Sequence, residues 1–154
     1  MKKKEPVWGL VILALLLRLL FVFGYPQYPP FLGDDAGYDN VAWNLANGRG
    51  FVADIISPEG TVTYEPLIAN GPTYPLFLAA VYRVFGHAIT AVRVVQAILG
   101  AVTIFFVFRI AQRAFGERVA CLSAALVAVH PALTFYTGML LSETVFTFLN
   151  SEVL

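Results

Sequence analysis

The residues best suited to chemistry are two adjacent carboxylates, Asp34 and Asp35, in the segment GDDAGYDN at residues 33–40. A carboxylate can act as a general base toward a hydroxyl group, and its oxygens are ligands that divalent cations prefer. Aspartate is also a favoured N-cap, and acids in the first turn of a helix suit its dipole. The pair therefore has two compatible interpretations, as a helix cap and as a reactive or metal-binding group.

The segment 34–47 predicts a helix that starts at these carboxylates. Its apolar residues recur three and four positions apart and form one stripe: Tyr38, Val41, Ala42 and Leu45. Polar residues fall largely on the other side: Asp39, Asn40, Asn44 and Asn47. Gly48 and Gly50 can end the helix. We expect an amphipathic helix that lies on a membrane surface.

The composition of the whole chain indicates a membrane protein. Of the 154 residues, 58% are hydrophobic and 13% are charged, whereas soluble domains carry about 25% charged residues. The formal net charge is zero, which gives no basis for nucleic-acid binding. The single cysteine, Cys121, has no second cysteine with which to form an internal disulfide.

Apolar segments predict three to four transmembrane helices, at about 7–23, 88–110 and 119–137, with a fourth that starts near 142. The segment 74–85 is too short to span and suits an interfacial helix. Pro131 is expected to kink the third span. Arg18 is expected to snorkel to the membrane interface. No small-residue cleavage site follows the first span, so we expect an uncleaved anchor rather than a signal peptide.

Basic residues predict the orientation of these spans. Three lysines precede the first span, and three arginines surround the connection between the second and third: Lys2, Lys3, Lys4, Arg109, Arg113 and Arg118. The positive-inside rule places both groups in the cytoplasm if 74–85 does not cross. Trp8, Tyr25 and Tyr28 read as interfacial aromatics. We expect an all-α integral membrane protein with a long external first loop, 24–87, that contains short amphipathic helices.

Several motifs follow one another in a definite order. The acidic pair fits D-[DE]-x-x-Y with Tyr38, and A-x-x-L-x-x-G-x-G-[FY] follows from Ala42 to Phe51. P-x-YP-L-x-L-A runs from Pro72 to Ala79, an Arg-Val-Val-Gln stretch from Arg93 to Gln96, and Ser-Glu ends at Glu143. This ordered set resembles the N-terminal part of GT-C membrane glycosyltransferases, which include protein O-mannosyltransferases and the aminoarabinose transferases of lipid A. Gly71 stands where many relatives have arginine, and Asp35 where many have glutamate.

The resemblance implies transfer of a sugar from a polyprenyl-phosphate donor to an acceptor at the outer membrane face. It implies that Asp34 is the base that deprotonates the acceptor hydroxyl, and that Asp35 supports it or binds a divalent cation. Arg93 is then a candidate to stabilise the leaving phosphate, its alternative being a snorkelling arginine. Tyr38, Tyr74 and Glu143 are the other candidate substrate-binding residues.

The alternatives to an enzyme are a non-catalytic membrane subunit, a transporter piece or an inactive fragment. A transporter is expected to carry ionisable groups or broken helices at the midplane of several spans, whereas the polar residues here gather in one loop. Similar enzymes are much longer, so we expect the N-terminal part of a larger enzyme in a bacterial or archaeal plasma membrane. His87 is predicted to be solvated in a turn, and no second ligand at helical spacing supports zinc binding at His130.

Overall fold

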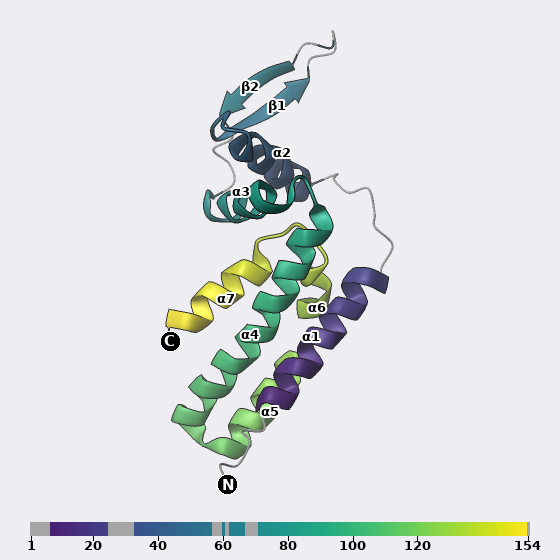
Figure 1. Cartoon of the computed structure of the whole chain (residues 1–154). Coiled ribbons are helices and arrows are strands. Elements are labelled where there is room, and N and C mark those ends of the chain that lie inside the picture. The colour runs from purple at the N-terminus through teal and green to yellow at the C-terminus, as the bar shows by residue number, and fades with distance from the viewer. Residues whose placement is uncertain (1–6, 25–32, 57–59, 61, 67–70, 154) are drawn as a thin grey trace. The chain divides into compact units, whose positions relative to one another are not determined.

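The computed structural model describes residues 7–24, 33–56, 60, 62–66 and 71–153. Its elements, shown in Figure 1, are α1 (Val7–Gly24), α2 (Asp34–Ala46), β1 (Val52–Ile56), β2 (Val62–Pro66), α3 (Thr73–Phe85), α4 (Ile89–Phe115), α5 (Glu117–Ala128), α6 (Pro131–Thr137) and α7 (Glu143–Val153). They form two compact units. We call residues 1–26 with 93–154 the helical unit, and residues 27–92 the loop unit. Lys2, Lys3, Lys4, Tyr25 and Tyr28 lie outside the described residues.

Two of the described helices are long and apolar enough to cross a membrane, α1 with 18 residues and α4 with 27. The predicted third span is a pair of helices, α5 and α6, which meet at a bend of 52° and together can form one span. The predicted fourth span corresponds to α7, an 11-residue helix. The predicted fold class, an all-α membrane protein, is confirmed, with two spans or, counting the bent pair, three.

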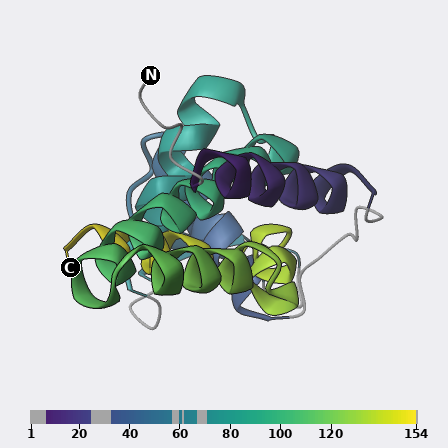
Figure 2. The same ribbon diagram turned by 90° about the horizontal axis from the view of Figure 1, so that it is seen from below.

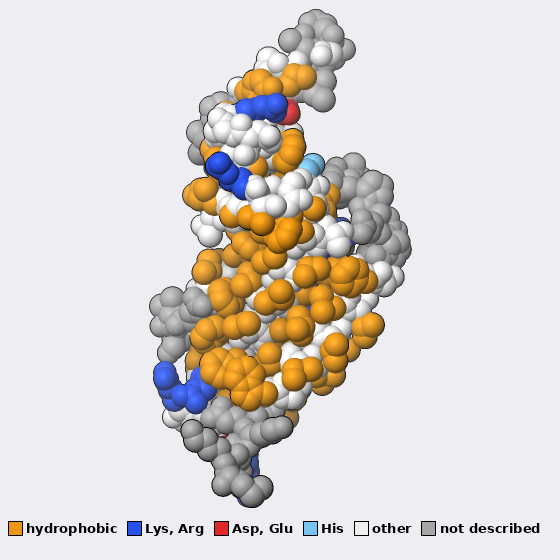
Figure 3. Space-filling view, in the orientation of Figure 1, with side chains coloured by type: hydrophobic (Ala, Val, Ile, Leu, Met, Phe, Trp, Pro, Cys, Tyr) orange, Lys and Arg blue, Asp and Glu red, His pale blue; other side chains and the backbone are white. Residues whose placement is uncertain are grey.

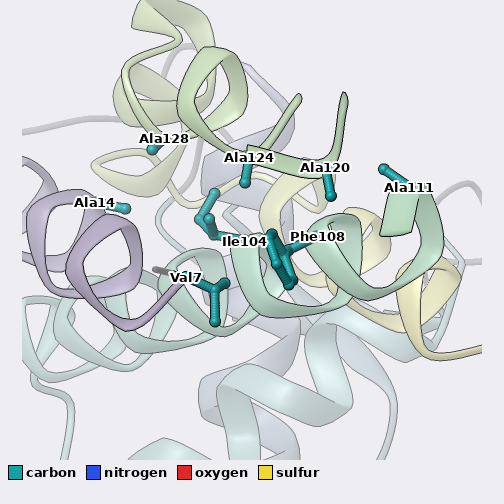
Figure 4. Packing of buried hydrophobic residues seen from close by; sticks show 8 residues of the cluster. All are labelled: Val7, Ala14, Ile104, Phe108, Ala111, Ala120, Ala124 and Ala128. Carbon is teal, nitrogen blue, oxygen red and sulfur yellow. The ribbon is translucent and has the colours of Figure 1, made fainter. Parts of the chain in front are cut away.

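The helical unit packs through small residues. The alanines of α5 that face inward are spaced by four and meet α1 and α4 around Val7, Ile104 and Phe108 (Figure 4): Ala120, Ala124 and Ala128. Small side chains allow helices to approach closely where no water drives their association. Helix α1 lies alongside α5 (Figures 1 and 2). The opposite side of α1 exposes large apolar residues, and apolar side chains cover the face of the helical unit that Figure 3 shows.

Contrary to the prediction, Arg18 does not extend its side chain to the membrane interface. Its side chain is 1% exposed, and Nη1 donates hydrogen bonds to the carbonyl oxygens of Ala14 (3.1 Å) and Ala128 (3.4 Å). Ala128 is the last residue of α5, where helical carbonyls lose their partners within the helix. The guanidinium therefore binds the backbone at the interruption between α5 and α6. A Cβ at Gly100 would lie 2.8 Å from Arg18 Nε, so the glycine makes room for this side chain.

Pro131 starts α6 and separates it from α5, a stronger effect than the predicted kink. Proline has no N–H to donate and its ring clashes with the preceding turn, so a continuous helix is disfavoured there. At the other end of α6, Gln96 Nε2 donates to the carbonyl oxygens of Thr137 (2.9 Å) and Met139 (2.8 Å). Side chains from α1 and α4 thus bind the backbone at the C-terminal ends of both α5 and α6.

The β-hairpin was not predicted from the sequence. Strands β1 and β2 pair antiparallel, from Val52 opposite Pro66 to Ile56 opposite Val62. Each strand has only five residues, and both lie in the predicted external loop, 24–87, in which we expected only short helices. β-branched residues occur in both strands and favour this conformation.

Candidate functional site

The acidic pair occupies the first turn of α2, as predicted, but neither aspartate caps the helix. Gly33 is the N-cap and makes no side-chain cap hydrogen bond. Asp34 is exposed, whereas Asp35 is half-buried and accepts a hydrogen bond from the Ala36 amide at its Oδ1 (3.0 Å). Both carboxylates lie at the positive end of the helix dipole, which favours negative charge. The arrangement leaves Asp34 accessible to a substrate.

Part of the polar side of α2 faces the protein rather than solvent, and the predicted position on a membrane surface stays a prediction. Asn44 is fully buried, and its Nδ2 donates to the carbonyl oxygen of Val52 (3.2 Å) and to Asp54 Oδ1. Asn40 Oδ1 accepts from the Asp54 amide (2.8 Å). The strand supplies the donors and acceptors that buried amides require. Asn40 and Asn44 therefore attach this part of α2 to β1.

Asp39 belongs to a group of interacting side chains that was not predicted from the sequence. Its carboxylate accepts hydrogen bonds from Tyr82 Oη and from His87 Nε2, which lies 2.9 and 3.0 Å from its two oxygens. The His87 ring stacks on Trp43, with centroids 4.7 Å apart, and meets the Tyr82 ring edge-on at 4.9 Å. We call Asp39, Trp43, Tyr82 and His87 the Asp39 cluster. His87 is 40% exposed at its side chain, yet it is partnered rather than simply solvated.

Two predicted substrate-binding residues contact each other. The rings of Tyr38 on α2 and Tyr74 on α3 meet edge-on, with centroids 4.9 Å apart. Tyr74 is 3% exposed and also stacks on Phe77. The contact joins the start of α2 to the start of α3. Its burial favours packing for Tyr74, and a role in sugar binding stays a prediction.

Arg93 and Glu143 belong to the helical unit. Arg93 lies in the second turn of α4 and is buried at 8% exposure. Glu143 starts α7, where an acid suits the helix dipole. Its Oε2 is buried and has no hydrogen-bond partner among the described residues. Contacts of Arg93 and Glu143 with substrate stay predictions.

A divalent cation at Asp35 stays a prediction. Within the described ranges, no group of three or more His, Cys, Asp or Glu side chains is placed to hold a metal ion. A magnesium ion usually retains several waters and binds one or two carboxylates together with substrate phosphates. Asp34 and Asp35 fit that mode, in which the phosphate of the substrate supplies further ligands.

Residues 69–150 match the family model of the dolichyl-phosphate-mannose-protein mannosyltransferases. The match covers more than half of the chain, from the segment before α3 to within α7, and includes Tyr74, Arg93 and Glu143. The acidic pair and Tyr38 precede the matched residues. No curated protein and no solved structure matches the chain. The chain belongs to the dolichyl-phosphate-mannose-protein mannosyltransferase family, a group of GT-C glycosyltransferases.

Proposed function

We propose that this chain forms the N-terminal part of an enzyme that transfers a sugar from a polyprenyl-phosphate donor to an acceptor at the outer membrane face. Membership of the family supports a glycosyltransferase that uses a lipid-linked sugar. The observation that carries the site assignment is the accessible Asp34 at the start of α2, next to the half-buried Asp35.

Asp34 acts as the general base in this proposal. Its carboxylate takes the proton from the acceptor hydroxyl, whose oxygen forms a bond to the anomeric carbon. The bond from that carbon to the phosphate oxygen breaks, and the phosphate leaves with the electron pair. Asp34 lies in the first turn of α2 and is exposed, so an acceptor hydroxyl can reach its carboxylate. Asp35 supports the base or binds a cation on the phosphate.

Arg93 and Glu143 contact the substrate in this proposal. A guanidinium stabilises the negative charge that develops on the leaving phosphate. Arg93 lies near the start of α4, directly after the last residue of the loop unit in the chain. Glu143 offers a carboxylate oxygen, Oε2, that no described residue binds, and a sugar hydroxyl could donate to it.

The packing of the helical unit supports an external loop unit. Trp8, at the start of α1, stacks on Phe105, and Val7 joins the same buried cluster as Ala111 and Ala120. The start of α1 therefore lies at the end of the unit that carries the arginine-rich connection from α4 to α5. The positive-inside rule places that end in the cytoplasm. This orientation would leave the loop unit, which follows α1 in the chain, on the outer side of the membrane.

The test is an assay of the full-length membrane protein with a polyprenyl-phosphate sugar. We expect Asp34→Asn to lower the transfer rate by about 100-fold or more, the usual contribution of a general base. Glu117→Gln is the matched control, because Glu117 is also exposed in the first turn of a helix. Normal expression of both variants with loss confined to Asp34→Asn supports the proposal. Equal rates in Asp34→Asn and wild type overturn the assignment of the base, and an inactive wild type favours a non-catalytic subunit.

A further inference from the structure

The Asp39 cluster has no part in the reaction described above, yet it joins three segments of the loop unit. Asp39 and Trp43 lie on α2, Tyr82 on α3, and His87 in the connection between α3 and α4. We propose that Tyr82 and His87 are positioning residues, which act through Asp39 to fix the rotation of α2 and hence the direction of its acidic pair. This inference rests on the proposed function.

The spacing along α2 connects the cluster to the acidic pair. Asp35, Asp39 and Trp43 are four residues apart, so they follow one another on the same side of the helix. One helical turn, a rise of about 5.4 Å, separates Asp35 from Asp39. A rotation of α2 about its axis moves both residues together. Any contact that fixes Asp39 therefore also fixes where the first turn points.

The contacts of Asp39 are well suited to hold such an orientation. His87 Nε2 reaches both carboxylate oxygens, and Tyr82 Oη donates to Oδ1. Hydrogen bonds to an ionised group are stronger than those between neutral groups. The Tyr82 side chain is 2% exposed and is held by packing. The imidazole stacks on the Trp43 ring at an interplanar angle of 24° and makes a T-shaped contact with the Tyr82 ring at 88°.

The C-terminal half of α2 is attached to β1 independently of the Asp39 cluster. The cluster can therefore set the direction of the first turn of α2 without determining whether the loop unit folds. Asn44, in the C-terminal half of the helix, is bound to β1 through Val52 and Asp54. The first turn is steadied on one side by the contact of Tyr38 with Tyr74. Loss of the His87 contact is therefore expected to free the N-terminal half of α2 and leave the hairpin docked. Misplacing a catalytic group by about 1 Å can lower a rate by about 100-fold.

The first experiment is steady-state kinetics on the full-length membrane protein with the polyprenyl-phosphate sugar. We expect His87→Ala to lower kcat by about 10- to 100-fold with little change in the KM for the donor, because a displaced base slows the chemical step. His87→Gln retains an N–H donor for Asp39 and is expected to recover much of kcat. His130→Ala, at the exposed histidine between α5 and α6, is the control and is expected to leave kcat unchanged. An unchanged kcat in His87→Ala overturns the inference if Asp34→Asn is inactive in the same assay.

The second experiment needs no activity and separates this inference from the proposed function. Hydrogen exchange is measured on the same full-length protein, as wild type and as His87→Ala and His87→Gln. The inference predicts faster exchange of the amides of residues 36–40 in His87→Ala, with wild-type exchange in residues 52–56. Wild-type exchange in both segments overturns the positioning role whether or not sugar transfer is observed. Faster exchange in both segments also overturns it, because the cluster would then stabilise the loop unit as a whole.

Discussion

The helical unit and the loop unit both bury polar side chains, but they bind different groups. In the helical unit, Arg18 and Gln96 donate to backbone carbonyl oxygens at the ends of α5 and α6. In the loop unit, Asp39 binds the side chains of Tyr82 and His87. A helix interrupted in a membrane has no water to satisfy its carbonyls, so side chains must do so. Polar groups in the loop unit are instead available to orient one another, and orientation is what a reactive group requires.

The largest expected effect is that of Gln96→Leu in the helical unit. It removes the donor from the carbonyls of Thr137 and Met139, and a buried group left without its partner costs about 1–3 kcal/mol. We expect a clear fall in the thermal stability of the purified protein in detergent. Gln112→Leu, a half-buried residue near the other end of α4, is the control. Equal losses in the two variants would contradict the assignment of a backbone-binding role to Gln96.

A smaller and more local effect is expected for Asn44→Ala in the loop unit. The change removes the hydrogen bonds to Val52 and Asp54. Because these two residues are half-buried, water can replace the lost donor, and the docking of the hairpin is expected to weaken by about 0.5–1.5 kcal/mol. Hydrogen exchange should rise in β1 and β2 and stay unchanged in α4. Asn47→Ala is the control, because the side chain of exposed Asn47 donates, among the described residues, only to the carbonyl oxygen of Trp43. If exchange rises in α4 as well, the two units do not respond separately.

The smallest effect is expected for Arg49→Ala. Arg49 is exposed, donates to Asn44 Oδ1 at 3.0 Å, and lies 5.6 Å from the ring centroid of Tyr64. Exposed contacts of both kinds contribute about 1 kcal/mol or less. Chemical denaturation monitored on the loop unit should therefore barely distinguish Arg49→Ala from wild type, with Arg49→Lys as the control for charge. A loss as large as that of Asn44→Ala would show that the exposed side chains also hold this network together.

Local patterns in the sequence predicted the helices well. The predicted segments 7–23, 34–47 and 74–85 correspond to Val7–Gly24, Asp34–Ala46 and Thr73–Phe85. Helix length and apolar spacing are properties of consecutive residues, and the glycines and prolines that end helices act on their neighbours. The position of the acidic pair in the first turn of α2 was predicted for the same reason. Its chemical role stays a prediction.

Contacts between distant residues were not predictable in this way. Arg18 binds a carbonyl 110 residues later, and Asp39 binds a histidine 48 residues later. Periodicity shows which side of a helix is apolar but carries no information on what the polar side meets. We therefore expected Arg18 to snorkel and His87 to be solvated, because these are the common environments of such side chains. The hairpin was missed because its strands are short and interrupt a polar segment.

The interruption between α5 and α6 has a consequence for how the protein is built into its membrane. With 12 and 7 residues, these helices are about 18 and 10 Å long, and neither alone crosses a hydrocarbon layer of about 30 Å. Helices α1 and α4 are synthesised earlier and are each long enough to insert alone. They carry Arg18 and Gln96, which bind the ends of the later pair. We therefore expect the integration of residues 117–137 to be favoured by helices already in the bilayer, so that membrane assembly of this region is sequential.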